Sequence, residues 1–257
     1  MNTLRRTSLK ALALGVGAVG LSRAAQAGPA DPLALAGAKT LDALAAKLAS
    51  FEPRRNFKTV PMILDRRDQW DADALDAVIH YAGSPKQSWD NTDLTGPWLN
   101  LMRNTMNAQN WSFKHPNFLC VSATHGSAQL ALYDDAMWEK YGLAKLAGGN
   151  VTNNRFVKAT EASAKDPANY QSVTGPFSAA ANSIQGLQKR GAVFLACHNA
   201  VWELSERLIT SGNNPDHLSV EAMCGELSNH LIPGVVLTPG AVGTLVELAT
   251  AGFAYSR

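Results

Sequence analysis

The chain has 257 residues, of which 46% are hydrophobic and 17% are charged, and this is enough to bury one good core. Four of its 23 basic residues lie within the first 27 positions, so a chain without that segment has 19 basic against 21 acidic residues. This slightly negative balance gives no support to nucleic-acid binding or to binding of an anionic membrane.

The first 27 residues have the pattern of an export signal. Residues 5–10 read RRTSLK, a twin-arginine pattern, and a mildly apolar run rich in Gly and Ala follows. Residues 25–27 read AQA, the small-x-small site that a signal peptidase needs. Because the uncharged run is only about a dozen residues long, it is too short for a spanning helix. We expect cleavage after Ala27, export by the twin-arginine route and a periplasmic mature chain with no membrane span.

The elements before residue 98 are predicted from periodicity and turn residues. Residues 28–56 form an N-terminal extension with a helix, in which leucines recur on one face. Residues 57–64 read as a strand, with Pro61 indicating an edge position or a bulge. Residues 70–83 read as a helix, and residues 84–97 as a polar, turn-rich stretch.

The rest of the chain alternates between helices and short apolar strands. Strands are predicted at 115–126, 192–199 and 234–242. Helices are predicted at 98–111, 127–142, 177–191, 200–209 and 219–231, with a closing helix and aromatic tail at 243–257. This order predicts an α/β fold, with a parallel sheet sandwiched between helices in one domain at 57–257. Residues 148–176 are predicted to be a long polar loop.

Ligands of parallel sheets collect beyond the carboxyl ends of the strands, and Cys197 lies at one such end. There the strand gives way to a helix, whose backbone N–H groups favour a thiolate. His198 follows directly, and His125 lies at the end of another strand. Such a thiol is suited to act as a nucleophile, a sulfur carrier or a metal ligand. The alternative is that Cys197 is a small packing residue in the core.

The two other cysteines have weaker cases. Cys120 lies within its strand and is expected to be inert packing, whereas Cys224 lies on a helix, either in the core or at the surface. An odd number of cysteines leaves at least one thiol unpaired within the chain. The sequence has no glycine-rich nucleotide motif, no Gly-x-Ser-x-Gly, no Cys-x-x-Cys and no His-Glu-x-x-His.

Four segments between about residues 99 and 255 share one further pattern: NLMRNTMN, FLCVSATHGSAQLAL, IQGLQKRGAVFLACHNAV and LIPGVVLTPGAVGTLVELATAGFAYSR. Together they resemble the DsrE-like family of sulfur-handling proteins (the DsrE/DsrF/TusD superfamily). The resemblance implies a compact three-layer α/β fold, often assembled as trimers or hexamers. Sulfur-relay members carry a persulfide on the strand-end cysteine that Cys197 matches. Those members are cytoplasmic, whereas this chain carries an export pattern.

The resulting hypothesis is an exported DsrE-like homo-oligomer that handles sulfane sulfur through Cys197, as a possible sulfur carrier or transferase. His198 and His125 would tune its ionisation, and the ligand-binding residues would be Asn199, which polarises the bound group, Thr238 and Gly240. The expected partner is a small sulfur species or a sulfur-donor protein, with no organic cofactor. One alternative is a soft-metal or haem-binding protein using Cys197 with His125 or His198. Another is a non-catalytic oligomeric scaffold.

Overall fold

The computed structural model describes residues 33, 35–51, 55–148 and 150–257. The export signal predicted at residues 1–27 therefore lies outside the described residues. A five-stranded, all-parallel sheet forms the centre of the fold, in the order β4-β3-β2-β1-β5. The strands are β1 (Lys86–Asn91), β2 (Leu119–Thr124), β3 (Val193–Cys197), β4 (Val235–Thr238) and β5 (Ala254–Ser256).

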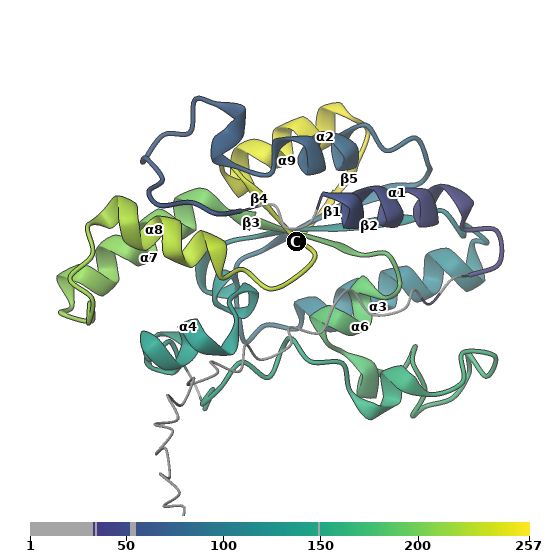
Figure 1. Ribbon diagram of the computed structural model, residues 1–257. Helices are drawn as coiled ribbons and strands as arrows, with labels where there is room; N and C mark the ends of the chain where they lie inside the picture. The colour runs from purple at the N-terminus through teal and green to yellow at the C-terminus, as the bar shows by residue number, and fades with distance from the viewer. Residues whose placement is uncertain (1–32, 34, 52–54, 149) are drawn as a thin grey trace, which may run out of the picture.

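Helices cover both faces of this sheet (Figure 1). One face carries α1 (Lys39–Ser50), α2 (Ala72–Ile79) and α9 (Ala241–Thr250). The other side carries α3 (Trp98–Asn107), α4 (Asp135–Lys140), α6 (Ile184–Gln188), α7 (His198–Thr210) and α8 (Val220–Asn229). The prediction of an α/β fold with a parallel sheet between helices is confirmed.

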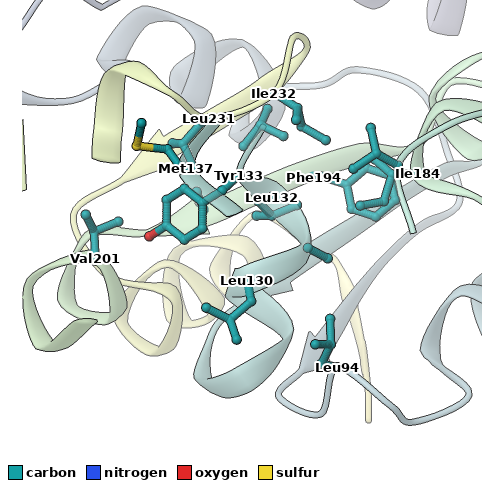
Figure 2. Packing of buried hydrophobic residues seen from close by; sticks show 14 of the residues in the cluster. Leu94, Leu130, Leu132, Tyr133, Met137, Ile184, Phe194, Val201, Leu231 and Ile232 are labelled. Atoms are coloured by element: carbon teal, nitrogen blue, oxygen red, sulfur yellow. The ribbon is translucent and has the colours of Figure 1, made fainter. Parts of the chain in front are cut away.

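Alternation along the central strands divides the core in two. In β2, Leu119 and Val121 face the cluster under α1 and α2, whereas Cys120 faces the larger cluster on the other side. Every residue of β2, β3 and β4 is buried, as expected for strands covered on both faces. Figure 2 shows the larger cluster, in which Phe194 lies beside Ile184. Trp98 of α3 packs edge-on against Phe194 at 6.1 Å between ring centroids.

The first strand was placed wrongly by the sequence. Residues 57–64 are not a strand; their backbone bonds to α8, where the Val60 N–H donates to the Glu221 carbonyl. β1 instead comes from the stretch predicted to be turns. The strand was missed because several of its side chains are polar. In the fold these side chains form hydrogen bonds with neighbouring strands rather than with solvent. Asn91 Nδ2 donates to Ser122 Oγ at 2.8 Å, for example.

Three predicted helices are shorter or divided. Residues 126–132 form the 3-10 helix η3 (Gly126–Leu132). The separate helix α4 begins after Asp134, its N-cap residue, whose side chain accepts a hydrogen bond from the Met137 N–H. Residues 177–191 contain the turn η5 (Ala179–Ala181) and α6. The chain end leaves α9 and adds β5 beside β1. Shorter elements are η1 (Arg67–Gln69), η2 (Ala108–Ser112), α5 (Ala144–Ala147) and η4 (Glu161–Ala164).

The N-terminal helix and the polar loop both pack on the domain. α1 buries Leu41, Leu44 and Leu48 against α2 and the sheet, which is the first of the two positions that its periodicity left open, the main body or a neighbouring subunit. The described part of residues 148–176 contains only the short helix η4. Its Tyr170 ring stacks on Trp111 of η2 at 5.5 Å between centroids, which fixes this loop against the end of α3.

Candidate functional site

Cys197 is the last residue of β3 and the N-cap residue of α7. Its Cα pairs in register with that of Thr238 at the end of β4. The residue is 5% exposed, so its sulfur lies just below the surface at the carboxyl edge of the sheet. Cys197 therefore lies at the junction of a strand and a helix, as the sequence predicts.

Two helix N-termini converge on this thiol. The N–H of Ala241, the first residue of α9, donates to Cys197 Sγ at 3.2 Å, and α7 begins directly after Cys197. The N–H of Cys197 itself donates to Gln129 Oε1 at 3.1 Å, which holds the junction in place. Helix N-termini carry partial positive charge, and two of them, with one direct N–H donor, adjoin the sulfur. Gln129 had no recognisable signal in the sequence.

Small side chains surround the sulfur. Cys197 packs with Ala123 and Ala241, and Ala200 and Leu245 lie against this group. With only 5% of the residue exposed, a small reactant reaches the sulfur more readily than a protein surface does.

His198 points away from that sulfur. Its side chain is fully buried, with Nε2 at 3.0 Å from the Met62 carbonyl oxygen and Nδ1 at 3.8 Å from Cys224 Sγ. Burial lowers the pKa of His198, while hydrogen bonds to the backbone at Met62 and Pro61 oppose this shift. Both ring nitrogens therefore contact buried groups, one on α8 and one in the segment before α2. The first turn of α7 directs this side chain inward.

His125 belongs to a polar group at the same edge of the sheet. Its Nε2 lies 2.7 Å from Asp90 Oδ1, and the Tyr255 hydroxyl donates to Asp90 Oδ2 at 2.8 Å. Burial alone would raise the pKa of Asp90. The hydrogen bonds from His125 and Tyr255 and the nearby positive charges outweigh it, so this pKa lies below its ordinary value. Asp90 and Tyr255 were missed because neither β1 nor β5 was predicted as a strand.

The register relates His125 to Cys197. Thr124 pairs with Ala196, and the next residues along the two strands are His125 and Cys197. Because parallel strands keep this register, the two residues occupy equivalent positions at the ends of neighbouring strands. Of the two histidines predicted for the site, His125 lies at the same edge of the sheet as the Cys197 sulfur. Its ring is hydrogen-bonded to the carboxylate of Asp90.

The three predicted ligand-binding residues have different surroundings. Thr238 is buried, and its hydroxyl donates to the Ala196 carbonyl at 2.9 Å, so it serves the sheet. Asn199 is exposed, and its amide lies against Gly240, the N-cap residue of α9. A Cβ at position 240 would come within 2.9 Å of Asn199 Nδ2. Asn199 and Gly240 therefore form one contact at the rim beside Ala241.

Cys120 and Cys224 are both core residues with 0% exposure. Burial raises the pKa of each thiol to about 12, although Arg190 opposes the shift at Cys120 and Ser228 opposes it at Cys224. Cys224 thus lies in the core rather than at the surface, the point that the sequence left open. Neither thiol is ionised near neutral pH.

A cavity of about 310 Å³ lies next to the Cys197 junction. Its lining includes Gln129 and Ala200, which also contact Cys197 or its backbone. Glu203 and Arg207 of α7 add a negative and a positive charge to the same lining. The cavity offers space for a small polar molecule at this edge of the sheet.

Among the described residues, no group of three or more His, Cys, Asp or Glu side chains is placed to hold a metal ion. The helices of this part of the chain are all too short or too polar to cross a bilayer. No family model, curated protein or solved structure matches the chain.

Proposed function

We propose that this protein is a carrier of sulfane sulfur, of the DsrE-like kind, that holds the sulfur on Cys197. The observation that carries the proposal is the hydrogen bond from the Ala241 N–H to Cys197 Sγ where α7 and α9 begin. A thiolate at that position is stabilised without a metal or an organic group.

The loading step follows from this geometry. The Cys197 thiolate attacks the outer sulfur of a small persulfide, R–S–SH, and a new S–S bond forms. The S–S bond of the donor breaks, and R–S⁻ leaves with its electron pair, so Cys197 carries –S–SH. Atoms and charge balance, and no external oxidant or reductant is needed.

His125 is proposed to orient the incoming persulfide. An ionised carboxylate only accepts hydrogen bonds, so the contact with Asp90 calls for a proton on His125 Nε2. Where Nδ1 carries no proton, it is an acceptor for the S–H of the incoming persulfide, and that proton stays on the transferred sulfur. His198 has no such role in this proposal, because its ring faces Met62 and Cys224.

Intact mass spectrometry after incubation with a low-molecular-weight persulfide tests the assignment. We expect an adduct of about 32 Da per added sulfur atom, removed by a thiol reductant. Cys197→Ser should abolish it, whereas Cys120→Ser and Cys224→Ser are matched controls that keep it. Loading of the Cys197→Ser protein, or none on the wild type, would refute the proposal. A reductant-resistant metal adduct would instead favour the soft-metal alternative.

Export and assembly belong to the same proposal. Changing Arg5 and Arg6 to Lys should trap the precursor in the cytoplasm, and unchanged export would exclude the twin-arginine route. A homo-oligomer is proposed from the family resemblance. Light scattering that gave a monomer mass at micromolar concentration would contradict it.

A further inference from the structure

The cavity beside Cys197 lies along one face of α7. Its lining comes from α7, from η3 and from Leu146 of α5, and η3 contacts both of these helices. The lining residues of α7 recur three and four positions apart, so they share one face of the helix: Ala200, Glu203, Leu204 and Arg207. Its volume of about 310 Å³ is at the lower end of the range usual for small-molecule sites, which suits a single small metabolite.

One end of this cavity adjoins the sulfur. Ala200 packs with Cys197, and Gln129 Oε1 accepts the Cys197 N–H at 3.1 Å, and both residues line the cavity. Glu203 and Arg207 lie further along α7, about 9 and 15 Å from Cys197 measured along the helix axis. Because helical side chains lean toward the helix N-terminus, both charged groups lean back toward the sulfur. A molecule in the cavity therefore lies between the thiol and these two charges.

The two charges of the lining have opposite sign. Residues four apart on a helix can reach one another, but no ion pair joins Glu203 to Arg207. Within the part of the chain that the structure describes, neither side chain has a hydrogen-bond or ion-pair partner. The other lining residues are uncharged, and three of them are leucines: Leu130, Leu146 and Leu204. The cavity thus offers one carboxylate and one guanidinium beside apolar side chains.

This pattern matches the charges of an α-amino acid, which carries an ammonium and a carboxylate on one carbon. We propose that the sulfur donor is the persulfide of a free amino acid, cysteine persulfide, with its ammonium on Glu203 and its carboxylate on Arg207. A sulfur and two carbons separate these groups from its outer sulfur, and this short chain lies beside the leucines and directs that sulfur to Cys197. The inference rests on the proposed sulfur-carrier function and names its donor.

The transfer from this donor is balanced. The Cys197 thiolate forms a bond to the outer sulfur, the S–S bond of the donor breaks, and the thiolate of free cysteine leaves with the electron pair. Cys197 then carries –S–SH, and the released cysteine takes a proton from solvent. A persulfide that lacks one of the two charged groups undergoes the same step but is held less well in the cavity.

Loading rates of the full-length protein with four small persulfides test the assignment. Cysteine persulfide carries both charged groups, cysteamine persulfide lacks the carboxylate, 3-mercaptopropionate persulfide lacks the ammonium, and 2-hydroxyethyl persulfide lacks both. Each rate, measured by intact mass, is divided by the rate of the same donor with a small free thiol, which removes differences between the leaving groups. We expect the normalised rate to fall about fivefold for each charged group that the donor lacks.

Variants of the cavity assign each charge to its partner. With Arg207→Met, cysteine persulfide should load no faster than cysteamine persulfide, because the carboxylate has lost its partner. With Glu203→Gln, it should load no faster than 3-mercaptopropionate persulfide. Glu206→Gln is the matched control, since Glu206 is exposed on the same helix, accepts a hydrogen bond from Trp202 and lies outside the cavity lining. This control should keep the preference of the wild type.

The outcomes separate the donor from the function. Equal normalised rates for all four donors, or equal effects of Glu203→Gln and Glu206→Gln, would overturn the donor assignment and leave the sulfur-carrier proposal standing. Failure of every donor to load Cys197 would overturn both. The donor series on the wild type does not depend on the folding of any variant.

Discussion

A cysteine at the carboxyl end of the sheet and one near its amino end have contrasting surroundings. At the carboxyl end, Cys197 accepts a backbone N–H from the start of α9 and caps α7. Toward the amino end of the adjacent strand, Cys120 is fully buried, and its pKa is raised to about 12 although Arg190 is close. A nearby cation thus does not make a thiol reactive when burial dominates. At the carboxyl end, the helix N-termini that a parallel fold gathers there place a backbone N–H donor beside the Cys197 sulfur instead.

The polarity of the fold explains this contrast. In a parallel sheet with connecting helices, the helices that follow the strands begin at the carboxyl end, so their N–H groups point to that edge. The amino end receives its positive charge from a side chain, Arg190, which is buried. The arrangement at the carboxyl end is the one suited to chemistry on a thiol.

Alkylation rates would give the largest contrast between the two ends. At pH 7, native Cys197 should react with iodoacetamide at least about a hundredfold faster than Cys120, because burial raises the pKa of Cys120 to about 12 and each unit lowers the ionised fraction of that thiol tenfold. Peptide mass spectrometry measures both sites in one sample. If Cys197 reacts only after unfolding, the comparison fails and the packing interpretation of Cys197 holds.

Gly126 tests how tightly the carboxyl edge is built. Its φ of +55° and the Thr92 carbonyl oxygen, 2.8 Å from a Cβ, disfavour any side chain. Gly126→Ala should lower the free energy of unfolding by about 2–4 kcal/mol. Gly142→Ala is the matched control, with the same φ of +55° but no atom within 4 Å of its Cβ, and should cost about 1–2 kcal/mol. Equal losses in urea melts would show that the close approach to Thr92 adds nothing.

Serine substitutions compare the two thiols in stability rather than reactivity. Cys120→Ser buries a hydroxyl in an apolar setting and should cost about 1–3 kcal/mol if the hydroxyl is unpaired. Cys197→Ser should cost less than about 1 kcal/mol, since Ala241 can donate its N–H to the hydroxyl oxygen. Urea denaturation measures both. The reverse order would mean that Cys197, not Cys120, is the packing residue.

The smallest effect concerns pH and the buried His198. Because burial lowers its folded pKa below the ordinary value of 6.5, the unfolded chain binds its proton first as pH falls. His198 therefore contributes full stability above pH 6.5 and loses it as pH falls through the folded pKa. His198→Gln should flatten this part of the profile measured by urea melts between pH 5 and 8.

His230 supplies a control of opposite sign. Its hydrogen bond to Asp134 raises its pKa, so its contribution is full below pH 6.5 and is lost as pH rises through the folded pKa. His230→Gln should remove that loss. Profiles that changed in the same direction in both variants would contradict these two burial and pairing effects.

The sequence by itself determined the alternation of strands and helices, the parallel sheet and the strand-end position of Cys197. These follow from local signals, namely apolar runs too short for helices and helical periods between them. It also separated Cys120 from Cys197, since the former lies within its strand. Such features depend on a few consecutive residues, and no distant contact is needed to read them.

Only the tertiary structure decided where β1 and β5 lie and which side chains meet Cys197. β1 is polar, and its Asn91 and Asp90 find partners 31 to 165 residues away. The donor to the Cys197 sulfur comes from α9, whereas the adjacent His198 turns inward to Cys224. Neighbours in sequence diverge at the start of a helix because successive side chains point in different directions. The packing of remote strands brings Asp90, His125, Tyr255 and Cys197 to one edge, and only the folded chain contains that information.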